Sequence, residues 1–379
     1  MTRIVIGMSG GVDSSLAASL LREQGHDVIG VTMKLWPCAE IDGGFTRADA
    51  CCSPGETIDA RAVAVGAGVP HYVVDCEDEF QASVVDRFIA GYAAGETPNP
   101  CVRCNESIKF GALWDYADRL GAERVATGHY ARVGTAFDRW LLRTAVDRAK
   151  DQTYFLFSLT QAQLARAEFP VGGMTKAEVR EAAGARAIST AQKAESMDLC
   201  FTGRDGVEGF LRRKLPQAFV PGPIMHIDGT VLGEHQGLGA VTVGQRKGLG
   251  VAWTEPLFVV KRDVAANTVV MGPRAALMVD TLHLRECTWH VAAPTAAGLT
   301  CRVRLRHHGT PVPATIFPTE TGARVHLHQP QQRTGAGQAC VAYDDAGEWC
   351  LGGGWIGPGR AGGTADSASV PIGAHVTGA

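Results

Sequence analysis

The segment Gly7–Ser15, which reads GMSGGVDSS, constrains the fold of this chain more than any other. A short apolar run, Arg3–Ile6, precedes it and is typical of a buried strand. Apolar side chains at helical spacing follow over Ser14–Gln24, and Gly25 stands where a glycine commonly ends a helix. The segment therefore predicts a tight turn between a strand and a helix at the start of a layered α/β domain.

The same turn has the chemistry of a phosphate site. Gly10 and Gly11 allow the backbone to approach a phosphate group because no Cβ intervenes. N–H groups at the start of a helix, together with the hydroxyls of Ser9, Ser14 and Ser15, can bind phosphate oxygens. A plain strand–turn–helix connection is the alternative. The turn is not a Walker A loop, because no Gly-Lys-Ser/Thr follows it.

Short strands alternate with helical patterns over the first 130 or so residues, which predicts a doubly wound parallel sheet covered by helices on both faces. Strands are expected at Arg3–Ile6, Val28–Met33, His71–Val74 and Arg124–Thr127, and helices at Ser14–Gln24, Thr57–Val65, Glu79–Ala93 and Ser107–Leu120. Two more helical stretches fall within Gln161–Gly184, and another is expected at Val207–Leu215.

From about Gly222 the pattern changes to β-rich runs separated by turn residues, which indicates small antiparallel sheets or a barrel. These runs are Ala240–Val243, Leu257–Lys261, Thr268–Met271, Cys301–Leu305, Ala314–Ile316, Ala323–His326 and Ala339–Tyr343. We therefore expect a nucleotide-binding domain over residues 1–205, a small central domain over 206–278 and a C-terminal β-barrel over 279–358. The glycine-rich residues 359–379 are expected to be a disordered tail.

The composition, 45 % hydrophobic and 20 % charged, is that of an ordinary globular enzyme. A net charge of −3 neither indicates nor excludes a nucleic-acid partner, because a local basic stripe is sufficient. We expect a cytoplasmic protein without membrane contact, since the sequence shows neither a secretory leader nor an apolar run of about 18 residues. Its eleven cysteines, an odd number at irregular spacing, are then thiols and not a disulfide framework.

Two of the cysteines are candidates for catalysis. Cys104 lies in TPNPCVRCNESIKF, just ahead of an expected helix and near Arg103 and Lys109, a position that favours the thiolate form. Cys200 occurs about 96 residues later in AESMDLCFTGR. From spacing alone, both could equally be buried core thiols.

Metal binding is the other use that the cysteines suggest. Cys101-x-x-Cys104 is similar to half of a zinc or iron–sulfur site, but no second CxxC or CxxH follows at zinc-like spacing. We therefore expect no metal at the cysteines. Histidines such as His26, His71 and His290 have no partner at ligand spacing and indicate structural roles.

SGGxDS resembles the PP-loop of the ATP pyrophosphatase superfamily, whose members transfer AMP to a carbonyl oxygen and release pyrophosphate. From Gly7 to about Trp355, nearly its full length, the chain resembles tRNA-specific 2-thiouridylases of the MnmA type. The matching motifs are GMSGGVDSS, CCSPGETIDAR, TPNPCVRCN, ATGHYAR, KDQTYFLF, ESMDLCF, TVGQRKGLG and CLGGGWI.

The resemblance implies a role for each matching residue. Cys104 would be the nucleophile and Cys200 the carrier of a persulfide that alternates with a Cys104–Cys200 disulfide. ATP, with Mg²⁺ on its phosphates, would be bound by Gly7, Met8, Ser9, Gly10, Gly11, Val12, Asp13, Ser14, Met33 and Gly128. The target base and the tRNA would be contacted by Asn99, Pro100, Cys101, His129, Lys150, Asp151, Gln152, Arg304, Leu305 and Gln338.

Two positions depart from the family pattern. Many relatives read PNPD, with an aspartate proposed to shuttle protons, where this chain has Cys101. A thiol is a weaker acid than a carboxylic acid by about four pKa units, so we do not expect Cys101 to replace the aspartate directly as a general base. Cys101 could also compete with Cys200 for Cys104. Leu305 replaces a common tyrosine, which leaves that tRNA contact to Arg304.

The reaction implied is ATP-dependent thiolation of C2 of the uridine at the first anticodon position, U34. Adenylation turns O2 into a leaving group, and persulfide sulfur from a donor protein replaces it, giving 2-thiouridine, AMP and pyrophosphate. The donor would be a sulfur-relay protein or a cysteine desulfurase. An unpaired anticodon base can be splayed into a pocket without opening a duplex.

Three basic clusters could contact phosphates, although each could equally be a solvated face. They are Arg212–Lys214, Arg246 with Lys247, and Arg302 with Arg304 and Arg306, which alternate at strand spacing and so point to one side.

Two other functions fit parts of the sequence. An amide synthetase acting on a small metabolite would explain the PP-loop but neither the paired thiols nor the β-rich C-terminal third. A non-catalytic nucleotide- or tRNA-binding redox module would explain CxxC but leaves KDQTYFLF and the intact loop without a role.

Overall fold

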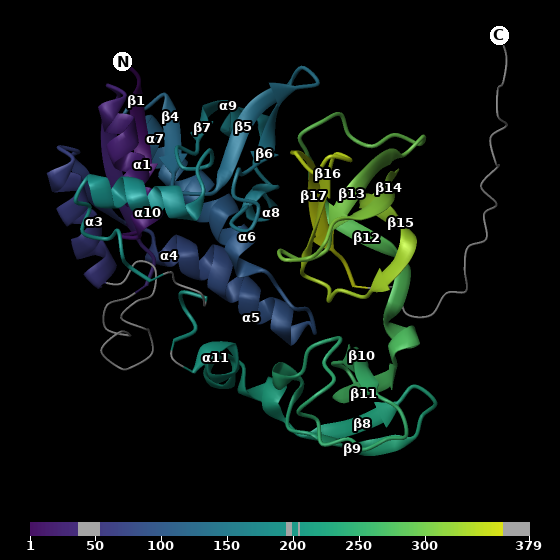
Figure 1. Cartoon of the computed structure of the whole chain (residues 1–379). Coiled ribbons are helices and arrows are strands. Elements are labelled where there is room, and N and C mark those ends of the chain that lie inside the picture. Colours follow the sequence, from purple (N-terminus) through teal and green to yellow (C-terminus); the bar gives the residue numbers. More distant parts are fainter. Residues whose placement is uncertain (37–53, 195–198, 204, 359–379) are drawn as a thin grey trace, which may run out of the picture.

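The computed structural model describes residues 1–36, 54–194, 199–203 and 205–358. It contains a parallel sheet near the N-terminus, a small central sheet, and an antiparallel sheet that closes into a barrel near the C-terminus (Figure 1). The predicted fold class is thereby confirmed. None of the helices in these residues is long and apolar enough to span a membrane.

The N-terminal sheet has five strands in the order β3-β2-β1-β4-β7, and every neighbouring pair is parallel. Carboxyl ends of parallel strands meet at one edge of a sheet, where such folds bind their ligands. The strands are β1 (Arg3–Gly7), β2 (Asp27–Lys34), β3 (His71–Asp75), β4 (Arg124–Thr127) and β7 (Ala167–Glu168).

Helices cover both faces of this sheet because its central strand is apolar on both sides. Ile4 and Ile6 of β1 enter one core, and Val5 between them enters the other. The first face carries α1 (Val12–Glu23), α3 (Pro54–Gly66) and α10 (Lys176–Ala185). The second carries α4 (Glu77–Phe80), η1 (Gln81–Val85), α5 (Asp86–Ala93), α6 (Pro100–Cys104), η2 (Asn105–Ala112), α7 (Leu113–Arg119) and α11 (Gly206–Lys214).

One helix begins earlier than the sequence predicts. We expected a helix over Ser107–Leu120, but α6, η2 and α7 run without a break from Pro100. Asn99 caps this helix by accepting a 3.4 Å hydrogen bond from Val102 N, and proline at the first position is pre-organised for helix. Cys104 therefore lies inside the helix and not ahead of it.

The C-terminal sheet closes on itself through six antiparallel strands, since β12 pairs with both β15 and β17. The barrel strands are β12 (Met278–Trp289), β13 (Leu299–Arg304), β14 (Val312–Thr319), β15 (Gly322–Gln332), β16 (Ala339–Tyr343) and β17 (Trp349–Ile356). An unpredicted hairpin, β5 (Ala131–Ala136) and β6 (Arg139–Thr144), extends the barrel sheet through β17, so the N-terminal region and the barrel share one sheet. In Figure 1 the hairpin stands between the two. The short helices α8 (Thr153–Leu156) and α9 (Gln161–Arg166) follow it.

The central sheet has the order β10-β11-β8-β9. Its strands are β8 (Gly222–His226), β9 (Val231–His235), β10 (Leu257–Asp263) and β11 (Thr268–Pro273), with 3-10 turns η3 (Pro216–Phe219), η4 (Leu238–Ala240) and η5 (Arg274–Leu277). The prediction of a strand at Ala240–Val243 is wrong: η4 ends there, and the Val241 carbonyl accepts a hydrogen bond from the Arg262 side chain at 3.0 Å.

Candidate active site

The PP-loop joins β1 to α1 at the carboxyl edge of the parallel sheet. Gly10 has φ +74°, and a Cβ there would lie 2.3 Å from the Glu56 carbonyl oxygen, so only glycine fits. Gly11 is the N-cap of α1 and leaves the first N–H groups of the helix without acceptors inside the helix. The backbone is therefore folded as a phosphate-binding turn would be.

Side chains around the loop hold it in this shape. The Ser14 hydroxyl accepts a hydrogen bond from Ser9 N at 3.2 Å, and Thr32 on β2 donates to the Met8 carbonyl at 2.8 Å. Gly128, which follows β4, packs against the start of α1: a Cβ there would lie 2.5 Å from Ser14 N. The predicted ATP residues from β1 and β4 thus meet at one point, and Met33 lies on the adjacent strand β2.

Lys176 and Lys193 contact the PP-loop, although both are far from it in the sequence. Lys176, the first residue of α10, lies 2.8 Å from both carboxylate oxygens of Asp13, and Tyr130 also donates to Asp13 at 2.8 Å. Lys193 contacts the Gly10 carbonyl at 3.2 Å and forms an ion pair with Glu56 at 2.7 Å. Both are cations from distant segments, and each is paired with carboxylates at the loop, Lys176 with Asp13 and Lys193 with Glu56 and Asp59.

The two candidate thiols border one apolar cluster. Cys104 and Cys200 are half-buried, and both pack against the core of the second sheet face. Phe201, the residue after Cys200, contacts the rings of Phe80 and Phe88 with centroids 5.9 and 5.2 Å apart. This aromatic packing anchors the Cys200 backbone and supplies a poorly hydrated surrounding.

Cys76 adds a third thiol to this region. It follows β3 directly and is 2 % exposed. Burial raises the pKa of the Cys76 thiol to about 12, helped by the negative charges of Glu79 and Asp75. Cys76 and Cys104 pack in the same apolar cluster, and Cys76 follows β3 at the edge of the sheet that carries the PP-loop.

The central sheet and the barrel contact residues 95–97, the segment that leads into α6. The Arg262 guanidinium, from β10, donates to the Gly95 carbonyl at 2.6 Å and to the Thr97 hydroxyl at 3.2 Å. Arg285, from the barrel, pairs with Glu96 at 2.8 Å. Gln338 donates to the Thr97 carbonyl at 2.7 Å. All three regions of the chain thus fix the approach to Asn99, Pro100 and Cys101.

Arg103, the residue before Cys104, contacts the barrel and its own helix. Its guanidinium lies 4.2 Å from the Trp355 ring centroid and forms ion pairs with Glu106 at 3.0 Å and Glu286 at 2.6 Å. It connects α6 to the barrel.

His129 is buried beside the PP-loop. Its Nδ1 lies 2.7 Å from the Thr127 hydroxyl, and Phe110 and Phe169 flank the ring. Burial, with the nearby charge of Lys109, holds the pKa of His129 well below its ordinary value, so the ring is neutral. A neutral buried ring offers a tRNA phosphate no charge.

Lys150 ends a turn that begins at Asp147 after the hairpin, and Asp151 and Gln152 follow it directly. Asp151 is 2 % exposed, accepts hydrogen bonds from Ala145 N and the Thr153 hydroxyl, and pairs with Arg304 at 3.1 Å. Gln152 and Tyr130 exchange two hydrogen bonds, of 2.8 and 2.9 Å. The structure thus brings two predicted tRNA residues, Asp151 and Arg304, into contact with each other.

Arg304 has a further contact inside the protein, because its guanidinium lies 4.8 Å from the Tyr343 ring centroid. Leu305 is 8 % exposed and packs in the barrel core. β13 ends at Arg304, so Arg302 and Arg304 lie in the strand, whereas Arg306, predicted to alternate with them, lies beyond its end. Arg306 is exposed, and Arg302 is half-buried.

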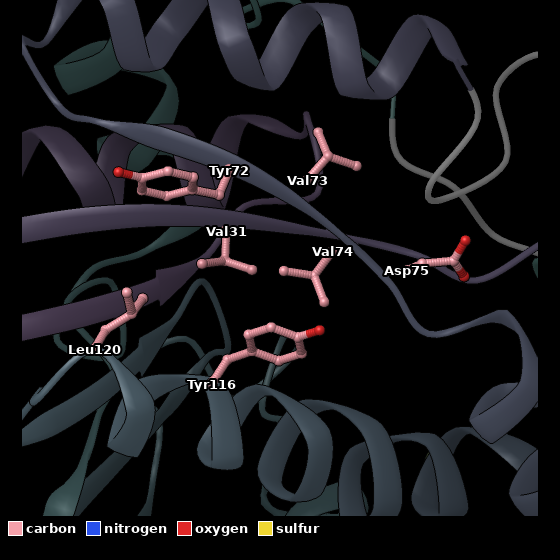
Figure 2. A pocket seen from close by; sticks show the side chains of 7 residues that line it. All are labelled: Val31, Tyr72, Val73, Val74, Asp75, Tyr116 and Leu120. Atoms are coloured by element: carbon pink, nitrogen blue, oxygen red, sulfur yellow. The ribbon is translucent and has the colours of Figure 1, made fainter.

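The described residues contain no cluster of three His, Cys, Asp or Glu side chains that could hold a metal ion. A shallow pocket of about 310 Å³ lies along β3 and α7, between Tyr72, Val74 and Tyr116 (Figure 2). None of its lining residues belongs to the PP-loop or to α6, so it is distinct from the candidate site.

A parallel sheet that carries an SGG-x-DS turn at its carboxyl edge defines the class of PP-loop enzymes. Three family models match consecutive parts of the chain: a tRNA methyl transferase HUP domain over residues 2–204, a tRNA methyl transferase PRC-barrel domain over 208–273 and an aminomethyltransferase beta-barrel domain over 279–356.

Curated relatives match over nearly the full length. The tRNA-specific 2-thiouridylase MnmA of Chloroflexus aurantiacus is 46 % identical over 94 % of this chain and 98 % of its own. That of Geotalea uraniireducens is 46 % identical over 93 % of this chain and 94 % of its own. The chain belongs to the family of tRNA-specific 2-thiouridylases of the MnmA type. A solved 4-thiouridine synthetase–RNA complex with bound ATP covers 57 % of this chain and 50 % of its own, at 20 % identity and a TM-score of 0.35, too distant to bear on function.

Proposed function

We propose that the protein thiolates C2 of the wobble uridine, U34, of tRNA, using ATP and an enzyme-bound persulfide. The observation that carries this proposal is the placement of two different chemistries at one edge of the sheet. The PP-loop turn follows β1, and Cys104 packs in the same apolar cluster as Cys76, which follows β3, two strands away.

The first half-reaction uses the PP-loop. The N–H groups of the first turn of α1 and the Ser9 hydroxyl would hold the polyphosphate of ATP, and Lys176 and Lys193 would offset its charge. Mg²⁺ would accompany the phosphates, since it binds through substrate oxygens with few protein ligands. The uridine O2 attacks the α-phosphorus, pyrophosphate leaves, and O2 becomes part of an AMP leaving group.

The second half-reaction uses the thiols. The outer sulfur of a persulfide on Cys200 attacks C2 and AMP departs, which leaves C2 joined to Cys200 through two sulfur atoms. Cys104 attacks the Cys200 sulfur and breaks the S–S bond. Its electron pair leaves with the outer sulfur as 2-thiouridine, and a Cys104–Cys200 disulfide remains. The aromatic cluster beside Cys200 would keep water from the persulfide and the adenylate.

The tRNA would meet the surface between α6 and the barrel. Asn99, Pro100 and Cys101 would line the target base, and His129, Lys150, Gln152, Leu305 and Gln338 would shape or contact the surface around it. Asp151 and Arg304, which pair with each other, would position the turn that carries Lys150. A sulfur-relay protein or cysteine desulfurase would recharge Cys200.

Product analysis tests the proposal. The protein is incubated with ATP, unmodified tRNA, and cysteine with a cysteine desulfurase as the persulfide source, and AMP, pyrophosphate and 2-thiouridine are measured. We expect all three in equal amounts and only with tRNA present. Cys200→Ser should abolish 2-thiouridine while ATP binding is kept. Turnover of ATP without tRNA when an amide donor is supplied would contradict the proposal.

A further inference from the structure

A further thiol, Cys101, lies one helical turn before Cys104, and the proposed reaction does not use it as a thiol. Cys101 is the second residue of α6 and is exposed, whereas Cys104, the last residue of α6, and Cys200 are half-buried. The disulfide formed in the reaction would therefore join two half-buried thiols, Cys104 and Cys200. An exposed thiol, Cys101, lies beside Cys104.

We propose that Cys101 is a resolving thiol that resets the enzyme after each turnover. The Cys101 thiolate attacks the Cys104 sulfur of the Cys104–Cys200 disulfide and moves the disulfide to Cys101–Cys104. The inference rests on the proposed function, because that reaction generates the disulfide which Cys101 opens.

The exchange balances without any other reactant. One S–S bond forms between Cys101 and Cys104, and the bond between Cys104 and Cys200 breaks. Its electron pair leaves on Cys200 as a thiolate, and the proton of Cys101 passes to solvent. A small dithiol then reduces Cys101–Cys104 at the surface, while Cys200 is ready to take persulfide sulfur.

Helix geometry makes the pair competent. Residues three apart on a helix have Cβ atoms about 5–6 Å apart, and a disulfide needs about 3.5–4.5 Å. Tightening the turn toward 3-10 geometry brings residues i and i+3 into line and shortens this distance. The first turn of a helix can tighten most readily, since its N–H groups have no partners within the helix. The cap bond from Val102 to Asn99 is long, at 3.4 Å.

Burial explains why a relay is useful. Cys200 is followed by Phe201, which packs among the rings of Phe80, Phe88 and Phe210. This aromatic packing limits the access of a soluble reductant to the Cys104–Cys200 disulfide. Cys101 carries the oxidising equivalents from that apolar cluster to an exposed position.

Cys76 is the matched control thiol. It packs in the same apolar cluster as Cys104, but it is 2 % exposed. Burial raises the pKa of Cys76 to about 12, so it supplies almost no thiolate for exchange at neutral pH. Position near Cys104 is therefore not sufficient, and exposure distinguishes Cys101.

Disulfide mapping tests the inference directly. Trypsin cleaves after Arg103, so Cys101 and Cys104 fall on separate peptides, residues 88–103 and 104–109, and Cys200 falls on residues 194–204. The full-length reduced protein is treated with one equivalent of diamide, free thiols are alkylated at successive times, and the cross-linked peptides are quantified.

In the wild type we expect the 104–109/194–204 pair first and the 88–103/104–109 pair to replace it. In Cys101→Ser the first pair should persist, and Cys76→Ser should behave as the wild type does. A wild-type protein that keeps Cys104–Cys200 while Cys101 stays alkylated would overturn the relay.

Turnover separates a relay from proton transfer. With cysteine and a cysteine desulfurase as the persulfide source, ATP, tRNA and limiting dithiothreitol, Cys101→Ser and Cys101→Asp should both recycle at least about tenfold more slowly than the wild type. If Cys101→Asp recycles as the wild type does, a carboxylate suffices and the relay is wrong. The first-turnover yield of 2-thiouridine is measured in the same samples. Its complete absence in the wild type would contradict the proposed function, whereas the diamide result would still decide the relay.

Discussion

Gly10 shows how a single residue limits what the PP-loop tolerates. Its φ of +74° and the Glu56 carbonyl 2.3 Å from a Cβ position mean that Gly10→Ala must strain the turn or displace α3. We expect its Kd for ATP to rise at least about tenfold, which corresponds to about 1.4 kcal/mol. Gly11→Ala is the matched variant, because its φ is −89° and its Cβ would lie 3.6 Å from the Ser9 hydroxyl. Isothermal titration should show a smaller change for Gly11→Ala; equal losses would contradict this reading of the turn.

His129 makes stability depend on pH. Its pKa in the folded state is well below the ordinary value of about 6.5 that it regains on unfolding. As the pH falls below about 6.5, only the unfolded state takes up this proton, so His129 lowers the free energy of unfolding by up to about 1.4 kcal/mol per pH unit. Above that pH its effect disappears.

The measurement is urea unfolding of the wild type and His129→Gln between pH 5 and pH 8. Other histidines with lowered pKa values, such as His290 and His307, contribute to both proteins equally. We therefore expect the difference between the two curves to narrow as the pH falls below about 6.5. A difference that is constant with pH would show that His129 has the same pKa in the folded and unfolded states, which would contradict the burial effect.

Among the elements, the turn that carries Lys150 to Gln152 depends on one buried ion pair. The Asp151 side chain is 1 % exposed and the Arg304 side chain 14 % exposed. Removing one partner leaves a buried charge, so Asp151→Leu or Arg304→Met should each cost about 3–5 kcal/mol of unfolding free energy.

The double variant Asp151→Leu with Arg304→Met should lose clearly less than the sum of the two single losses, because no unpaired charge remains. Glu23→Ala, which breaks the exposed pair with Arg186, should cost less than about 1 kcal/mol. Additive losses in urea unfolding would mean that the Asp151–Arg304 contact does not stabilise the turn.

Some elements could not be predicted from the sequence, and particular residues explain why. The hairpin β5–β6 turns at Phe137 and Asp138, which have φ of +52° and +55°. Such turns usually carry Asn-Gly, so Phe-Asp gives no turn signal. The helix start at Pro100 was missed because CVRCNE shows little apolar periodicity, although Asn99 before a proline is a legitimate cap.

The candidate site divides in the same way. Glycines at 10 and 128 and the thiols at 104 and 200 were predicted from contiguous motifs. Lys176 and Lys193 could not be predicted as neighbours of the PP-loop. Each is more than 160 residues away from the loop residue that it contacts, and neither belongs to the loop motif. Tertiary contacts of this kind leave no local pattern.

At the scale of the whole molecule, the barrel and the central domain contact the segment that leads into α6, which carries Cys101 and Cys104. Arg262, Arg285 and Gln338 all bind the segment Gly95–Thr97. The barrel sheet also includes a hairpin from the N-terminal region. Docking of a large substrate on the C-terminal regions can therefore act on the position of α6 and its two cysteines.

The central claim is that this enzyme installs sulfur on a tRNA uridine, and nucleoside mass spectrometry of tRNA from a strain lacking the protein tests it most directly. We predict that 2-thiouridine and its derivatives at the wobble position disappear and return when the wild-type gene is supplied. The Cys200→Ser gene should not restore them. Undiminished wobble 2-thiouridine in the strain without the protein, when no second copy of the gene is present, would contradict the claim.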